Sequence, residues 1–153
     1  MRPIKNLEAL GLQLPHPPQP VGAYIPGIKY NDQIFISGQL PIKDGKLMFS
    51  GALGLDLTVE QGAYAAQLCA LNALSILNEL NDGLDTLHII KLTGYIRSID
   101  TFSNHPSVLN GASEFFGQIF EDRGNHARAV VGVSSLPLGA AVELEVIAAI
   151  GKN

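Results

Sequence analysis

The chain has 153 residues, of which 46% are hydrophobic and 16% are charged, a composition that predicts one folded domain and excludes a disordered chain. The net charge is −4 at pH 7 and the ten Lys and Arg residues are dispersed, which argues against a nucleic-acid partner. The sequence shows neither a basic-then-apolar leader nor an apolar run long enough to span a bilayer, so we expect a cytoplasmic protein without membrane contact.

The N-terminal third is predicted to contain a short helix and a hairpin. A helix is expected within residues 1–14, where leucines recur at helical spacing, and the proline-rich stretch after it should be extended. We therefore interpret residues 1–20 as an N-terminal extension to one domain over residues 21–153. Residues 21–30 and 33–38 form a predicted hairpin that turns at Asn31 and Asp32, and a further short strand is expected over residues 47–49.

A long helix is predicted over residues 59–80. Thr58 is a favourable N-cap residue, and Gln61 follows three positions later, which is the pattern of a capping box. Alanines and leucines recur every three or four positions, so a broad apolar face should pack on the sheet. The only cysteine, Cys69, lies in this apolar run, which favours a buried, inert thiol over a nucleophile.

A strand and a second helix follow, over residues 88–99 and 101–122. In the strand, Ile90 and Leu92 are predicted to share the apolar face, and Lys91 and Thr93 the opposite one. The predicted order is two strands, a helix, a strand, a helix and two strands. This order indicates an α+β fold with a mixed sheet and two helices packed on one face.

Two strands are predicted in the last quarter of the chain, on either side of the turn at residues 136–139. Alternation places Arg128 and Val130 together on one face of the first strand, and Glu143 and Glu145 together on one face of the second. We interpret both faces as the helix-free side of the sheet. Because Val130 and its small apolar neighbours are poor choices for open water, we expect another subunit to cover this side.

Common catalytic and cofactor-binding motifs are absent from the sequence. There is no GxxxxGK[ST], no GxGxxG after a strand, no GxSxG and no HExxH. The four histidines are scattered, so neither a metal site nor a cofactor is expected. Serines are plentiful, but none has an evident base-plus-carboxylate context. An arginine with acidic and small polar groups suits the binding of a small carboxylate and the steering of a water molecule.

Two stretches resemble the signatures of a known family. VGAYIPGIKYNDQIFISGQLP resembles the N-terminal signature of the RidA/YjgF family, the reactive-intermediate deaminases once labelled L-PSP endoribonucleases, and HARAVVGVSSLPLGAAVELEVIA resembles its C-terminal signature. The resemblance extends over residues 21–150. It implies a chorismate-mutase-like fold, a homotrimer whose sheets enclose a barrel, and clefts between subunits. It also implies that the last strand is inserted elsewhere in the sheet than beside the preceding one.

The resemblance assigns roles to individual residues. Arg128 matches the arginine that holds the substrate carboxylate, and Glu143 matches the acid beside the attacking water, with pairing to a buried cation as its alternative role. Further positions match residues near the ligand: Tyr24, Ser37, Gly38, Asn110 and Val130. Interface packing is the alternative for Tyr24, and a hydrogen bond within its helix is the alternative for Asn110.

The resemblance implies hydrolytic deamination of small enamine or imine intermediates such as 2-aminoacrylate, which gives a 2-oxo acid and ammonia. The alternatives are a non-catalytic module that binds a small carboxylate as a sensor or chaperone-like partner, and an endoribonuclease, which the acidic balance disfavours. Val130 stands where many deaminases have cysteine, and Ala23 where proline often precedes the tyrosine. Together with a longer N-terminal segment and a longer connection over residues 41–58, these departures predict a divergent subgroup and leave the substrate open.

Overall fold

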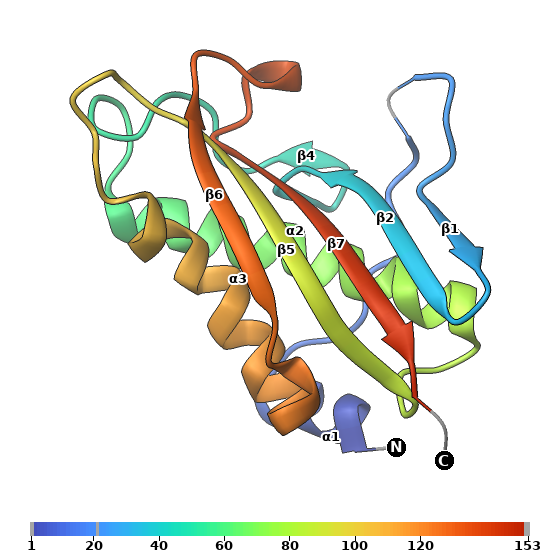
Figure 1. The fold of residues 1–153 in the computed structure, drawn as a ribbon. Helices are drawn as coiled ribbons and strands as arrows, with labels where there is room; N and C mark the ends of the chain where they lie inside the picture. The colour runs from blue at the N-terminus through green and yellow to red at the C-terminus, as the bar shows by residue number, and fades with distance from the viewer. Residues whose placement is uncertain (1, 21, 152–153) are drawn as a thin grey trace.

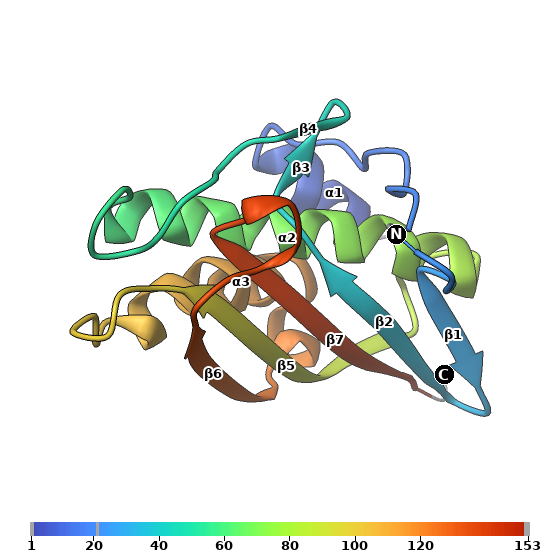
Figure 2. The ribbon, with the colours of Figure 1, turned by 90° about the horizontal axis from the view of Figure 1, so that it is seen from above.

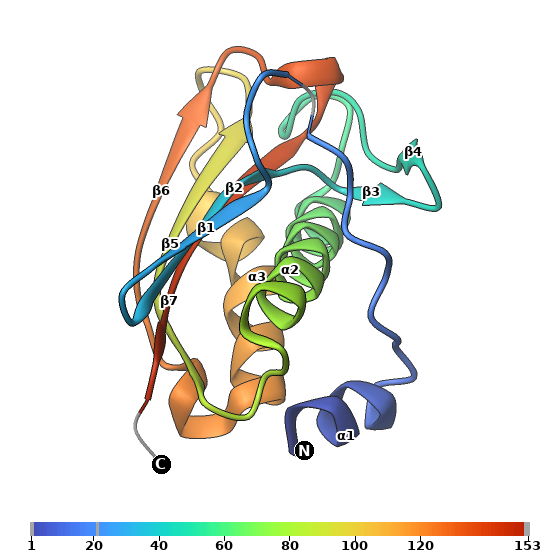
Figure 3. The same ribbon diagram turned by 90° about the vertical axis from the view of Figure 1, so that its right-hand side faces the viewer.

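The protein is an α+β structure in which helices cover one face of a sheet and leave the other face open (Figure 1 and Figure 3). This computed structural model describes residues 2–20 and 22–151, so Val21, the predicted start of the first strand, lies outside the described residues. The helices are α1 (Arg2–Ala9), α2 (Val59–Asn81) and α3 (His105–Phe120). The strands are β1 (Gly27–Tyr30), β2 (Gln33–Gln39), β3 (Ile42–Lys43), β4 (Lys46–Leu47), β5 (Leu87–Arg97), β6 (Ala127–Val133) and β7 (Val142–Ile150).

The last strand lies in the middle of the main sheet, whose order is β1-β2-β7-β5-β6 (Figure 2). β7 pairs antiparallel with β2 and with β5, whereas β6 pairs in parallel with β5 and forms an edge. The consecutive strands β6 and β7 therefore do not form a hairpin. The family resemblance implied this separation, and the structure confirms it. At the other edge, β1 and β2 form the predicted hairpin, and Asn31 in its turn adopts a left-handed φ of 53°.

The long helix α2 begins with the predicted capping box. Thr58 Oγ1 accepts a hydrogen bond from the Gln61 backbone N–H at 3.2 Å, and Gln61 Oε1 accepts one from the Thr58 backbone N–H at 2.9 Å. The helix ends at Asp82, whose φ of 52° is left-handed. Its sheet-facing side is buried, including Cys69. Within the described residues no helix, α2 included, is long and apolar enough to cross a membrane.

Several other elements differ from their predicted bounds, and the strand predicted over residues 88–99 is β5, which ends two residues earlier. The first strand begins only at Gly27, and the strand expected over residues 47–49 is instead β4, which pairs with β3. The second helix is shorter than the predicted residues 101–122. It begins at His105 with Pro106 in its first turn, and it is followed by a 3₁₀ turn at Glu121–Gly124. Proline is favoured at a helix start because the amide N–H that it lacks has no partner there.

The register of β5 and β6 overturns the predicted orientation of Arg128 and Val130. Directly paired residues on neighbouring strands point to the same face. Arg128 pairs with the fully buried Leu92, and Val130 pairs with Gly94, which lies against the Leu109 side chain of α3. Both residues therefore point to the helix side, not to the helix-free side. An arginine is tolerated there because β6 is the sheet edge, where its long side chain reaches polar groups of α3.

β7 shows the predicted alternation. Glu143 pairs with Tyr95 and Glu145 pairs with Thr93 on the helix-free face, whereas the intervening residues of β7 are buried in the core. The predicted orientation of Ile90 in β5 is wrong. A bulge in the ladder between β5 and β7 leaves Ile90 46% exposed, and the preceding residue, Ile89, is buried in the core instead.

The N-terminal segment packs on the helix layer. Leu7 of α1 is only 1% exposed and belongs to the main hydrophobic core, and Asn6 Nδ2 donates a hydrogen bond to the carbonyl oxygen of Ile119 in α3 at 2.9 Å. From α1 the chain runs past α2 on the side away from the sheet and reaches the loop before β1 (Figure 3). This path brings residues 18–20 close to the end of β2 and the start of β7.

Candidate functional site

One group of predicted site residues lies where β2 bends away from β7. Ile36 pairs with Val146 and Gln39 with Leu144, so the two residues between them, Ser37 and Gly38, form a bulge opposite one residue of β7. The Glu143 side chain occupies the space beside this bulge. A Cβ atom at position 38 would collide with Glu143 Oε1, so glycine is the residue that leaves room for the carboxylate.

Glu143 is a half-buried carboxyl group with a raised pKa. Burial is the larger cause, and the negative charge of Glu145 on the same face is the second. Tyr95 donates a hydrogen bond from its hydroxyl group to Glu145 Oε1 at 3.2 Å. Burial and this carboxylate raise the pKa of Tyr95, so its hydroxyl stays protonated at neutral pH. A carboxyl group with a raised pKa exchanges protons closer to neutral pH than an exposed glutamate does.

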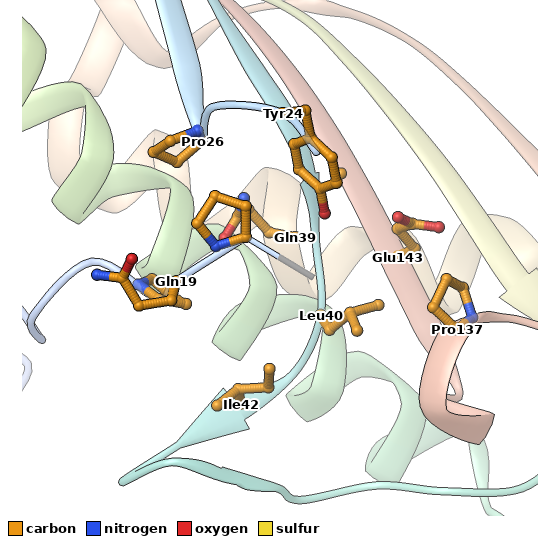
Figure 4. Close-up of a pocket in the computed structure, with 11 residues that line it drawn as sticks. Gln19, Tyr24, Pro26, Gln39, Leu40, Ile42, Pro137 and Glu143 are labelled. Carbon is orange, nitrogen blue, oxygen red and sulfur yellow. The ribbon is translucent and has the colours of Figure 1, made fainter. Parts of the chain in front are cut away.

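A small cavity opens beside the Glu143 carboxylate (Figure 4). Its volume is about 60 Å³, which is room for a few water molecules. Tyr24 and Glu143 lie on different sides of it, and residues 18–20 of the N-terminal segment also line it. Ser37 acts on the loop that carries Tyr24, because its Oγ donates a hydrogen bond to the Ile25 carbonyl oxygen at 2.7 Å. We call Tyr24, Ser37, Gly38 and Glu143 the Glu143 half-site.

The other group lies at the edge strand β6, on the helix side. Arg128 Nη1 donates a hydrogen bond to Ser113 Oγ at 3.1 Å, and Nη2 donates one to the Pro106 carbonyl oxygen at 3.3 Å. Asn110 follows Pro106 by four residues and precedes Ser113 by three, so all three lie on one flank of α3. Val130 lies on the same face of β6 as Arg128 and packs against the core. We call Asn110, Arg128 and Val130 the Arg128 half-site.

The sheet separates the two half-sites within one chain. Arg128 pairs with Leu92 and points to the helix side, whereas Glu143 pairs with Tyr95 and points to the open side. The two residues are two strands and three positions apart, which corresponds to about 14 Å between Cα atoms by ordinary sheet spacing. A ligand of a few carbon atoms therefore cannot touch both side chains of the same subunit.

The comparison with known families covers almost the whole chain. Residues 5–150 match the family described as "YjgF/chorismate_mutase-like, putative endoribonuclease". The chain belongs to the YjgF/RidA family. Protein TCP17 of Trypanosoma cruzi is 38% identical over 148 residues, which covers 95% of this chain and 92% of that protein.

Two solved structures match this chain nearly end to end. Atu1372 of Agrobacterium tumefaciens has a TM-score of 0.90 at 36% identity and covers 97% of this chain and 93% of its own. A Shewanella oneidensis MR-1 protein has a TM-score of 0.95 at 32% identity, with coverage of 98% and 100%. Other solved structures, at 23–28% identity, have TM-scores of only 0.61–0.64. The predicted divergent subgroup of the YjgF/RidA family is thereby confirmed.

Sequence reasoning missed two residues near Arg128 in this YjgF/RidA chain: Ser113, which contacts Arg128, and His126, which contacts Ser113. Ser113 Oγ lies 2.8 Å from Nε2 of His126, and Nδ1 of His126 lies 2.6 Å from the carbonyl oxygen of Gly124. A serine nucleophile of the usual kind has a carboxylate behind its base, whereas here the carbonyl oxygen of Gly124 takes the place of the carboxylate. Two spacings could have found them: Ser113 lies one helical turn after Asn110, and His126 precedes Arg128 by two positions, the period of a strand.

The remaining chemistry-bearing residues do not add a metal or nucleophile site to this part of the YjgF/RidA fold. In residues 2–20 and 22–151, no three His, Cys, Asp or Glu side chains gather where they could hold a metal ion. Cys69 is buried, and burial raises the pKa of its thiol, which keeps it protonated and unreactive. The predicted burial of Cys69 is confirmed.

Proposed function

We propose that this chain hydrolyses small enamine or imine intermediates of the 2-aminoacrylate type to 2-oxo acids and ammonia, in clefts between subunits. The observation that carries this proposal is the state of the Arg128 guanidinium. Ser113 and Pro106 accept from two of its five N–H groups in the described part of the chain, which leaves three donors for an oxyanion. A planar guanidinium with adjacent donors suits a bidentate hold on the carboxylate of such an intermediate.

In this proposal, each site combines the Glu143 half-site of one subunit with the Arg128 half-site of its neighbour. The sheet keeps the two apart within a chain, so a site that uses both requires a second chain. Arg128 lies at the sheet edge, where a neighbouring subunit can approach, and the cavity beside Glu143 lies near the open face. A closed ring of identical subunits would repeat the same cleft at every interface.

The helix-free face supports self-association. Ile28 pairs with Phe35, which in turn pairs with Ile147, so an apolar row crosses β1, β2 and β7. Ile28 is 52% and Phe35 38% exposed in the single chain, and Val131 on β6 is 48% exposed on the same face. Exposed apolar side chains that adjoin one another across an open sheet are typical of a protein interface. They support the homotrimer that is implied by the family resemblance.

The proposed reaction needs no oxidant or reductant. Arg128 holds the substrate carboxylate, and water adds to the imine carbon while ionised Glu143 accepts one proton. Glu143 gives that proton to the nitrogen, which forms the carbinolamine. Glu143 then accepts the hydroxyl proton of the carbinolamine and passes it to the nitrogen as the C–N bond breaks, so a C=O group and ammonia are left. Imine and water thus give 2-oxo acid and ammonia in equal amounts. Tyr24 lines the same cavity as Glu143, and in this proposal it orients the water (Figure 4).

The test is the release of ammonia and 2-oxo acid from imino acids generated in situ, measured against the spontaneous reaction. We expect Arg128→Ala to lower kcat/KM by about a hundredfold, because a charge-assisted bidentate contact is lost. Arg128→Lys should restore little activity, because an ammonium group lacks the fork of donors. Light scattering checks that both variants keep their oligomeric state. If wild-type protein does not accelerate the reaction but is thermally stabilised by 2-oxo acids, the result would contradict the enzyme proposal and favour a non-catalytic module that binds small carboxylates.

A mixing experiment tests whether the site is shared between subunits. Arg128→Ala and Glu143→Gln proteins are each expected to be inactive. When they are unfolded, mixed and refolded together in equal amounts, about a quarter of the interfaces should join an intact Glu143 half-site to an intact Arg128 half-site. Activity should return to about that fraction of the wild-type value. No recovery from a mixture shown to contain hybrid oligomers would contradict a shared site.

A further inference from the structure

We infer that Ser113 and His126 are positioning residues that fix the guanidinium group of Arg128 for its ligand, an inference that rests on the proposed carboxylate-binding role of Arg128. The structure shows a continuous chain of contacts from the Gly124 carbonyl oxygen through His126 and Ser113 to Arg128. None of these residues except Arg128 belongs to the site implied by the family resemblance.

The direction of each hydrogen bond follows from its acceptor. A carbonyl oxygen only accepts, so Nδ1 of His126 carries the proton and donates it to Gly124 at 2.6 Å. In the neutral ring Nε2 then carries a lone pair, so it accepts from the Ser113 hydroxyl group at 2.8 Å. With its only proton committed to His126, Ser113 Oγ presents lone pairs to Arg128 Nη1 at 3.1 Å. These hydrogen bonds thus hold the rotatable hydroxyl group of Ser113 in one orientation, in which it accepts from Arg128.

Two acceptors on α3 define how the guanidinium lies. Nη1 is held by Ser113 and Nη2 by the Pro106 carbonyl oxygen, so both terminal nitrogens of Arg128 have an anchor on one helix flank. An unanchored arginine loses considerable side-chain entropy when it binds a ligand. If the guanidinium is already held, this side-chain entropy is lost on folding and not on binding, so the ligand binds more tightly.

Close packing fixes Gly124, which lies at the end of this row of hydrogen bonds farthest from Arg128. Gly124 is buried at the end of the 3₁₀ turn after α3, and a Cβ atom there would collide with the backbone of Phe116. Gly124 therefore lies directly on α3, and its carbonyl oxygen has a defined position for His126. Because α3 also carries Ser113, the same helix fixes the positions of both Gly124 and Ser113. We call the row of contacts from Gly124 through His126 and Ser113 to Arg128 the relay.

The chain offers a matched control in a second serine–histidine pair. Ser98 Oγ lies 3.3 Å from Nε2 of His105, and Gly132 of β6 lies against both side chains. The pair has the same chemistry and lies on the same side of the sheet, but its contacts in the described residues do not include Arg128. Ser98→Ala therefore removes a comparable hydrogen bond without touching the proposed relay.

The kinetic test compares Ser113→Ala with Ser98→Ala. Removal of the fixed acceptor should raise KM about tenfold and leave kcat nearly unchanged, because the held guanidinium contributes to binding before and during the reaction. His126→Phe should behave like Ser113→Ala, whereas His126→Gln, which keeps an acceptor for the serine proton, should recover most of the loss. In an Arg128→Ala background, Ser113→Ala should add nothing to KM. Ser98→Ala should leave KM unchanged.

An NMR measurement separates this inference from the proposed function. The Nε–Hε signal of Arg128, assigned by its loss in Arg128→Lys, should be sharp in wild-type protein and in Ser98→Ala, and broadened in Ser113→Ala. If the signal and KM are the same in Ser113→Ala as in wild type, the positioning role is wrong while the deaminase proposal stands. If wild-type protein neither releases ammonia nor binds 2-oxo acids, the proposed function is wrong, and the NMR signal alone then decides whether Ser113 holds Arg128.

Discussion

Glu143 holds its position because residue 38 is a glycine. The bulge in β2 brings the backbone so close to the carboxylate that a Cβ atom would overlap Oε1. We expect Gly38→Ala to displace the carboxylate from the cavity and to lower kcat by about a hundredfold, the usual contribution of an acid–base group. Gly117 in α3 is the matched control, because nothing lies within 4 Å of an added Cβ atom there.

Gly117→Ala should leave kcat unchanged and raise the free energy of unfolding by about 0.5–1 kcal/mol, because alanine favours the helix. Denaturant unfolding and steady-state kinetics measure both quantities on both variants. Wild-type kcat in Gly38→Ala would show that Glu143 does not work from the position seen beside the bulge.

The raised pKa of Glu143 sets the sign of the pH dependence. Ionised Glu143 accepts a proton in the proposed reaction, so activity should fall as the pH drops through the pKa of Glu143, which burial and Glu145 raise in the single chain. Glu145→Gln removes one cause of the raised pKa and should move this acid limb to lower pH. A guanidinium group from a neighbouring subunit would lower the pKa in both proteins, so the direction of the shift stays the same.

The pH profile of kcat/KM for wild type, Glu145→Gln and Glu143→Gln measures this effect. Glu143→Gln should lose the acid limb together with most of the activity. An acid limb at the same pH in wild type and Glu145→Gln would show that a group other than Glu143 titrates.

At the scale of elements, local signals predicted α2 and the first hairpin, because a capping box and a two-residue turn act within a few residues. The orientation of β7 was also predictable, since only one of its two alternating sets is uniformly apolar. The orientation of β6 was not predictable, because both of its alternating sets of side chains contain small or apolar residues. Only its pairing with β5 shows that Arg128 faces α3, and this pairing joins positions more than thirty residues apart.

The helix α1 tests how the N-terminal segment is joined to the rest of the chain. Leu7 is 1% exposed in the main core, whereas Leu10, just beyond the end of the helix, is 41% exposed. We expect Leu7→Ala to lower the free energy of unfolding by about 2–4 kcal/mol, because it leaves a cavity in a packed core. Leu10→Ala should change it by less than about 0.5 kcal/mol. Equal effects in denaturant unfolding would show that α1 is not part of the cooperative core.

At the scale of the whole molecule, sequence alternation could not show that Arg128 and Glu143 lie on different faces, because each residue was assigned to a face without knowledge of its neighbours. The family resemblance supplied the clefts between subunits. The sheet register now supplies a physical reason for them, since no single chain can place both side chains around one small ligand. Self-association is therefore a requirement of the proposed chemistry and can be tested through the open face.

Phe35 is the side chain through which that requirement is tested, because it lies between Ile28 and Ile147 on the helix-free face. Phe35→Glu should bury an unpaired charge at the interface and weaken association by at least about a hundredfold. The protein should then sediment as a monomer with unchanged far-ultraviolet circular dichroism, and it should lose its activity. Leu55→Glu, at a loop residue that is 74% exposed, should leave both assembly and activity intact. A monomeric Phe35→Glu protein with full activity would place the whole site in one chain, against the sheet geometry.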